Sequence, residues 1–129
     1  ICLGMQLLGK TSEEGQESGL SLIDMEFKRF KFDKDTNLKV PHMGWNSVFP
    51  VSEVGSRLSD GVNSRFYFVH SYYCVCHNID HVMFSSNYGF DFVSGVQNGN
   101  VFGVQFHPEK SHKYGMDFLS RFFGRQNRR

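Results

Sequence analysis

The feature that most constrains the fold is a series of segments rich in branched and aromatic residues in the second half of the chain. These segments are residues 65–76, 82–86, 91–97 and 101–106. Such residues favour pleated, half-buried strands. The last two segments are joined through Asn98-Gly99, a pair typical of two-residue hairpins with type I′ geometry. The sequence therefore predicts a largely antiparallel sheet in this half of the chain.

Helical patterns bracket this series. Residues 3–10 place apolar side chains on one stripe, and residues 112–123 repeat apolar side chains at helical spacing. With 129 residues, the chain suits one domain, and helices combined with strands predict an α/β layer structure with a mixed sheet. The chain begins Ile-Cys-Leu-Gly, without an initiator methionine or a strand on which the first helix could pack. We therefore expect residues 1–129 to be the C-terminal part of one domain whose N-terminal strands are missing.

The region between the first helix and the strand series gives weaker signals. Residues 11–19 read as a polar loop, and partial alternation over residues 21–32 favours a strand over a helix. Residues 39–48 contain Pro41 and Gly44, which argue against a regular central strand and predict an irregular loop.

Composition excludes several classes of function. The formal net charge of +1 comes from 14 basic and 13 acidic residues, so we expect neither nucleic acid nor membrane as a partner. No apolar run approaches the ~18–20 residues of a membrane span. These features predict a soluble, cytoplasmic protein.

The cysteines and histidines do not predict a metal site. Three cysteines form an odd, sparse set that suits reduced thiols, and Cys74 and Cys76 are expected to pack within a strand. His77, His81 and His112 have no metal-like spacing. We predict no metal and no cofactor.

Cys2 is the first candidate for chemistry. It stands directly before a helical pattern and next to Leu3-Gly4, as in a strand-to-helix turn that exposes a nucleophile. The positive end of a helix dipole lowers the pKa of a thiol, so we expect a lowered pKa for Cys2. Taken alone, a cysteine in such a place is more often a buried packing residue.

His107 and Glu109 form the second candidate. The apolar segment 101–106 ends abruptly in His107-Pro-Glu109. A histidine there can take a proton from a thiol while a carboxylate two residues later fixes its tautomer. Histidine and glutamate beside a proline also occur in ordinary loops, so this pair alone leaves both interpretations open.

The two pieces together resemble one family. Cys2-Leu-Gly-Met-Gln6 and Gly103-Val-Gln-Phe-His-Pro-Glu109 are similar to the nucleophile and His-x-Glu motifs of class I, triad-type glutamine amidotransferases, which have a flavodoxin-like mixed sheet. Within that class, the chain resembles glutaminase subunits of imidazole glycerol phosphate synthase. The motifs that carry this closer resemblance are Pro41-His-Met-Gly-Trp-Asn46, Phe66-Tyr-Phe-Val-His-Ser-Tyr72, Ser86-Asn-Tyr-Gly89 and His107-Pro-Glu-Lys-Ser111.

The resemblance implies a function for each matching residue. Cys2 would be the nucleophile, His107 the general base and Glu109 its orienting carboxylate, while the backbone N–H of Leu3 would donate to the oxyanion. The second oxyanion donor of the family lies on an upstream loop that this chain does not contain. The residues expected to bind the glutamine substrate are Gln6, Glu14, Ser71 and Tyr72. Glu14 could instead be an exposed loop acid, since Glu13 stands beside it.

The resemblance also implies a protein partner. The positions that match the family's synthase-facing surface and ammonia passage are Trp45, Asn46, Tyr67 and Lys110. An exposed tryptophan suits an interface anchor, although an isolated tryptophan is about as often a core residue. The expected assembly is a heterodimer with a cyclase subunit in histidine biosynthesis.

Other functions remain open from the sequence. A paralogous amidotransferase could supply ammonia to a sugar-modifying synthase in surface polysaccharide assembly. A glutaminase-like scaffold without activity is a second alternative, favoured by the absence of the upstream oxyanion loop. The order of cysteine and histidine alone would also allow a cysteine peptidase, but the matches at Gln6 and Ser71-Tyr72 favour free glutamine.

Overall fold

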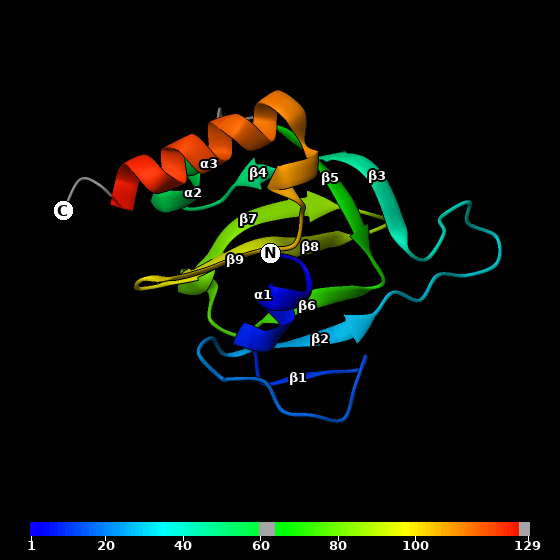
Figure 1. The fold of residues 1–129 in the computed structure, drawn as a ribbon. Helices are drawn as coiled ribbons and strands as arrows, with labels where there is room; N and C mark the ends of the chain where they lie inside the picture. Colours follow the sequence, from blue (N-terminus) through cyan, green and yellow to red (C-terminus); the bar gives the residue numbers. More distant parts are fainter. Residues whose placement is uncertain (60–63, 127–129) are drawn as a thin grey trace.

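The computed structural model describes residues 1–59 and 64–126, which form a mixed sheet with helices on it (Figure 1). The larger sheet runs in the order β1 (Thr11–Ser12), β2 (Met25–Arg29), β6 (Tyr72–Cys76), β8 (Asp91–Asn98), β7 (Val82–Asn87) and β4 (Phe49–Pro50), and β9 (Val101–Val104) also pairs with β8. β1 and β2 are parallel, whereas all other pairs in this sheet are antiparallel. The predicted α/β class with a mixed sheet is confirmed.

A second sheet contains only β3 (His42–Ser47) and β5 (Arg65–His70), which are antiparallel. The predicted irregular loop over residues 39–48 is therefore wrong. Pro41 lies just before β3, so its missing N–H removes nothing from the ladder. Gly44 has a φ of 129°, which glycine adopts without strain, and the strand continues through it.

The single strand predicted for residues 65–76 is two strands. β5 ends at His70 and pairs with β3, and β6 begins at Tyr72 and pairs with β2 and β8. Ser71 is the break at which the chain passes from one sheet to the other. Both strands are rich in aromatic and branched residues, so the amino-acid pattern did not mark the break.

Helices α1 (Leu3–Leu8) and α3 (His112–Gln126) confirm the two predicted helices. The sequence did not predict α2 (Glu53–Leu58), where the Ser52 hydroxyl accepts a hydrogen bond from the backbone N–H of Gly55. Figure 1 shows α2 beside α3 at one end of the molecule, while α1 lies near β9 and β6. Short 3₁₀ helices cover Ile79–His81 (η2) and Pro108–Lys110 (η3). No helix in residues 1–59 and 64–126 is both long and apolar enough to cross a membrane.

The predicted hairpin between β8 and β9 is confirmed, but its turn differs. Asn98 pairs with Val101, so the two loop residues are Gly99 and Asn100. The φ angle is 60° at Gly99 and is not positive at Asn100. A positive φ at the first loop residue alone is the pattern of a type II′ turn, and the expected type I′ geometry is wrong.

Two apolar clusters hold the functional segments in place. The larger is built mainly from phenylalanines of both sheets and α3, including Phe66, Phe68, Phe84, Phe106 and Phe118. The smaller joins α1 to the large sheet through Met5, Ile23, Met25, Phe27, Cys74 and Val96. All three cysteines are free thiols, and Cys74 is a packing residue as predicted. The second cluster fixes α1, and therefore the residue before it, against the sheet.

Candidate active site

Cys2 lies in a strained turn directly before α1. Its φ of 50° and ψ of −109° are unusual for a residue with a side chain. The turn is held by backbone hydrogen bonds: the N–H of Cys2 donates to Val104 O at 2.8 Å, and its carbonyl accepts from the N–H of Met5 at 3.0 Å. The Cys2 sulfur at this turn lies near Val69 O and the Gln105 side chain, and a sharp turn directly before a helix is what the sequence predicts for a nucleophile.

The sulfur of Cys2 has a donor on one side and an acceptor on another. The side-chain Nε2 of Gln105 donates toward Sγ at 3.6 Å, and Sγ lies 3.7 Å from the carbonyl oxygen of Val69 on β5. Burial raises the pKa of the Cys2 thiol above its ordinary value, and this outweighs the hydrogen bonds from the Leu3 N–H and Gln105 that lower it. The expectation of a lowered pKa is therefore wrong. Because burial disfavours the charged sulfur, deprotonation needs a base.

His107 has the geometry of such a base. Its Nδ1 lies 3.2 Å from both carboxylate oxygens of Glu109 on η3. A carboxylate can only accept, so Nδ1 carries the proton and Nε2 of the neutral ring presents its lone pair. Nε2 is buried and has no hydrogen-bond partner among the described residues. The imidazole, 17% exposed, is thus oriented by the carboxylate with its accepting nitrogen available.

The backbone of His107 is fixed to β5. Its N–H donates to Tyr67 O at 2.9 Å, the Ser111 hydroxyl donates to the carbonyl of His107 at 2.6 Å, and the N–H of Tyr67 donates to the same hydroxyl at 2.9 Å. Ser111 is fully buried. The sequence reasoning assigned no role to Ser111, although it closes the His107-Pro-Glu-Lys-Ser111 motif.

The two catalytic candidates approach each other through β5 and β9. Cys2 contacts Val69 of β5, and His107 pairs with Tyr67 two residues earlier on the same strand. The Cys2 backbone pairs with the last residue of β9, and the chain reaches His107 three residues later. Among the described residues, no direct hydrogen bond joins Cys2 to His107. Two segments about a hundred residues apart in sequence therefore lie side by side.

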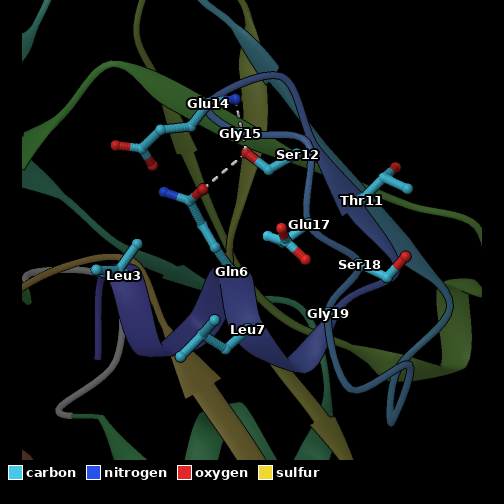
Figure 2. Close-up of a pocket in the computed structure, with 10 residues that line it drawn as sticks. All are labelled: Leu3, Gln6, Leu7, Thr11, Ser12, Glu14, Gly15, Glu17, Ser18 and Gly19. Carbon is cyan, nitrogen blue, oxygen red and sulfur yellow. Dashed lines mark hydrogen bonds between the residues drawn. The ribbon is translucent and has the colours of Figure 1, made fainter.

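A cavity opens beside α1, between the helix and the loop that follows β1 (Figure 2). Its lining includes Leu3, Gln6 and Glu14. The hydroxyl of Ser12 donates to Gln6 Oε1 at 2.8 Å and accepts from the N–H of Glu14 at 3.1 Å, the two dashed lines in Figure 2. Predicted substrate residues Gln6 and Glu14 thus share this cavity, which extends to Leu3, the predicted oxyanion donor.

Ser71 and Tyr72 are not among the residues that line the cavity. The Ser71 carbonyl accepts from the N–H of Phe30 at 2.9 Å. The Arg29 guanidinium lies 5.7 Å from the centre of the Tyr72 ring. Both residues follow Val69, whose carbonyl contacts Cys2, so they lie on the same stretch of chain as the nucleophile's neighbour.

The predicted partner residues separate onto two faces. Trp45 and Tyr67 are cross-strand partners on the outer face of the small sheet, with ring centres 6.4 Å apart, and Trp45 is 40% exposed. His112 stacks on Trp45 at 5.8 Å. Lys110 is exposed on η3. The side chain of Asn46 instead donates to Asn87 O at 2.7 Å and lies near His42 Nε2, on the inner side.

His42 and His70 form a buried pair on the inner face of the small sheet. His42 Nδ1 lies 2.8 Å from His70 Nε2, and His70 Nδ1 lies 2.8 Å from Tyr72 O. The carbonyl requires a proton on His70 Nδ1, so His42 Nδ1 donates to His70 and His42 Nε2 faces the amide of Asn46. Burial lowers the pKa of His42 to about 4 and that of His70 to about 3, so both are neutral near pH 7.

Comparison with known proteins identifies similar sequences over nearly all of the chain. Residues 1–125 match the family model described as glutamine amidotransferase class-I. The chain is 53% identical over 124 residues to imidazole glycerol phosphate synthase subunit HisH 2 of Pseudomonas aeruginosa, covering 95% of this chain and 59% of that protein. It is 48% identical to the HisH 2 subunit of Methanococcus maripaludis, with the same coverage, and 44% identical to the HisH subunit of Leptospira interrogans, covering 95% of this chain and 60% of that subunit. The chain thus spans about three-fifths of the length of these relatives.

Proposed function

The chain belongs to the class-I glutamine amidotransferase family, and on this basis we propose that its protein hydrolyses the side-chain amide of glutamine to glutamate and ammonia through a thioester on Cys2. His107 serves as general base and acid, and Glu109 orients it. The observation that carries the proposal is the state of the His107 imidazole. Its Nδ1 faces a carboxylate, while its buried Nε2 has no partner among the described residues, in a segment that also contacts the Cys2 sulfur.

The reaction begins with transfer of the thiol proton from Cys2 to Nε2 of His107. The thiolate attacks the amide carbon of glutamine, a C–S bond forms, and the amide oxygen becomes an oxyanion near the backbone N–H of Leu3. Collapse of this intermediate breaks the C–N bond, and His107 returns the proton so that ammonia leaves. Burial of the thiol, which raises its pKa, makes the base necessary for the first step.

Hydrolysis of the thioester completes the cycle. His107 takes a proton from water, the hydroxide attacks the thioester carbon, and a second oxyanion forms at the same donor. The C–S bond then breaks, glutamate leaves, and Cys2 regains its proton. Each step uses one acceptor nitrogen, and this agrees with the single unpartnered nitrogen of His107 among the described residues.

The cavity beside α1 is the proposed glutamine site. Glu14, which lines it, can receive the α-ammonium group of glutamine, and the amide of Gln6 can bind the α-carboxylate end. Ser71 and Tyr72, on the stretch after Val69, complete the proposed binding set. Leu3 lines the cavity and directly follows Cys2 in the chain, so we propose that the side-chain amide of glutamine lies at the Leu3 end of the cavity, next to Cys2.

The ammonia is proposed to pass to a cyclase subunit that makes imidazole glycerol phosphate in histidine biosynthesis, within a cytoplasmic heterodimer. Support comes from the relatives, which carry the name of subunits of imidazole glycerol phosphate synthase. Trp45 and Tyr67 form an exposed aromatic surface, and Tyr67 pairs with the backbone of His107. A partner bound at this surface would therefore contact the strand that positions the base.

The test is glutamate release from glutamine by the protein that carries this chain, with and without the cyclase subunit. We expect release that the cyclase increases and that Cys2→Ala abolishes, while the control Cys76→Ala retains it. Release that persists in Cys2→Ala would contradict the thioester route. Release that is indifferent to the cyclase would contradict the proposed partner and leave the hydrolysis intact.

A further inference from the structure

Gln105 lies on the segment between β9 and His107, and its side chain is completely buried. The backbone N–H of Gln105 donates to Ser94 O on β8 at 2.9 Å, which holds the residue in the sheet. Its Nε2 reaches the sulfur of Cys2 at 3.6 Å, whereas its Oε1 has no hydrogen-bond partner among the described residues. A buried carboxamide therefore makes one polar side-chain contact, and that contact is with the proposed nucleophile.

An apolar side chain of the same size would fill this position without leaving a carbonyl oxygen unpaired. Buried polar groups usually have partners, so a half-satisfied amide needs an explanation. A hydrogen bond from an amide to a neutral thiol is weak, whereas a bond to a charged acceptor is about twice as strong as one between neutral groups. The contact of Gln105 is therefore most favourable when Cys2 is a thiolate.

We propose that Gln105 is a positioning residue that donates its side-chain N–H to the Cys2 thiolate and stabilises that form before glutamine is attacked. The inference rests on the proposed function and deepens it. The thiol form of Cys2 can donate to Val69 O on the opposite contact, while the thiolate is repelled by that carbonyl and attracted by Gln105. When Cys2 loses its proton, its contact with Val69 O is therefore weakened and its contact with Gln105 Nε2 is strengthened.

Charged groups near Cys2 act on the same equilibrium. The carboxylate of Glu14 raises the pKa of the thiol, less than burial does. On the neighbouring elements, His107 follows β9 and His70 lies on β5. Gln105 differs from all of these because its amide does not titrate, so its contribution is the same at every pH at which the thiol ionises.

The experiment measures the rate of iodoacetamide alkylation of Cys2 against pH in the absence of glutamine, with mass spectrometry of the peptide that contains Cys2. Gln105→Met removes the donor and keeps the length and apolar fit of the side chain. We expect the midpoint of the profile to rise by about one pH unit, so that the rate near neutral pH falls about tenfold. The control Gln97→Met, at a half-buried glutamine of β8 whose side chain donates to Gly99 O, should leave the midpoint unchanged.

Thermal unfolding of the same variants separates positioning from packing. Gln105→Met also removes the unpaired carbonyl oxygen, so its melting temperature should equal or exceed that of the unmodified protein. A second apolar variant, Gln105→Leu, should give the same shift in the alkylation midpoint if loss of the donor is the cause. An unchanged midpoint in the folded Gln105 variants, or an equal shift in Gln97→Met, overturns the inference.

Alkylation reports on the sulfur alone, so this result is independent of whether glutamine is hydrolysed. A raised midpoint in Gln105→Met supports the inference even if the unmodified protein releases no glutamate, an outcome that would refute only the proposed function. Conversely, a protein that hydrolyses glutamine while its Gln105 variants keep the original midpoint would refute only the role of Gln105.

Discussion

His107 and the His42–His70 pair differ in the hydrogen-bond partners of their buried ring nitrogens. In the pair, the ring nitrogens contact one another, the carbonyl of Tyr72 and the amide of Asn46. In His107, Nδ1 faces Glu109 while the buried Nε2 has no partner among the described residues. The pair lies on the inner face of the small sheet, against the rings of Phe30, Phe68 and Phe92, whereas His107 lies three residues after the end of β9.

The difference separates a structural use of histidine from a chemical one. A satisfied, neutral pair gains nothing from a proton, and its lowered pKa values agree with that. A ring with one oriented nitrogen and one open nitrogen is prepared to accept a proton and return it. Substitutions at His107 should therefore lower activity, whereas substitutions in the His42–His70 pair should lower stability.

The largest expected effect is on activity in His107→Gln. Removing the base should lower kcat for glutamine hydrolysis by about 10³-fold, within the range of general acid–base contributions. The free energy of unfolding should change by less than about 0.5 kcal/mol, because Nε2 has no hydrogen-bond partner among the described residues and the contact of Nδ1 with the exposed Glu109 carboxylate contributes little. Steady-state kinetics and urea denaturation measure the two quantities. A strongly destabilised His107→Gln protein would mean that His107, like the His42–His70 pair, has a structural role.

A smaller loss of activity is expected in Glu109→Gln. The amide can donate to Nδ1, which favours the tautomer with its proton on Nε2 and leaves no acceptor for the thiol. We expect kcat to fall on the order of 10²-fold with little change in KM. Glu53→Gln, at an exposed residue of α2, is the matched control and should retain full activity. Equal activity in Glu109→Gln and the control would mean that the carboxylate does not orient the ring.

His70→Leu tests whether the His42–His70 pair serves stability and not activity. It leaves His42 Nδ1 and Tyr72 O without their partner in the core, so the free energy of unfolding should fall by about 2 kcal/mol. Activity per folded molecule should stay within about threefold of the original, because the pair makes no proposed contact with the substrate. Urea denaturation gives the first value, and His77→Leu, at an exposed position, serves as control. A loss of activity in His70→Leu as large as that in His107→Gln would contradict a purely structural role for the His42–His70 pair.

The last prediction concerns the dependence of stability on pH. The folded-state pKa values of about 4 for His42 and about 3 for His70 lie below the ordinary value of 6.5, so the unfolded chain binds more protons between these limits. The stability of the neutral pair is complete above pH 6.5 and is lost as the pH falls, by about 1.4 kcal/mol per pH unit for each histidine. Denaturation at pH 7 to 5 should show this slope, and His70→Leu should reduce it by about half. An unaltered slope in that variant would assign the pH dependence to other groups.

Sequence reasoning succeeded where chemistry fixes the residue type and failed where backbone geometry decides. The two motifs placed Cys2 and His107-Pro-Glu109 at the ends of elements that the fold brings together. The division of residues 65–76 between two sheets had no signal, because both parts are equally apolar. The strand at His42–Ser47 was missed because proline and glycine were read as breakers, although one precedes the strand and the other suits its backbone.

The supporting residues were missed for a different reason. Gln105 and Ser111 both lie inside the motif that identified His107, yet their side chains act through burial and contacts that no pattern reveals. The direction of the Cys2 pKa also required the structure. The helix dipole was the only influence visible in the sequence, whereas the burial that raises the pKa of the thiol is visible only in the structure.

The central claim is that Cys2 attacks a glutamine bound beside α1, and a glutamine analogue with a diazoketone in place of the amide tests it most directly. Attack by Cys2 on this analogue would form a stable C–S bond and release N₂. The account predicts modification of the peptide that contains Cys2, protection by excess glutamine, and none on Cys74 or Cys76. Modification confined to Cys76, or modification of Cys2 that glutamine does not prevent, would contradict it.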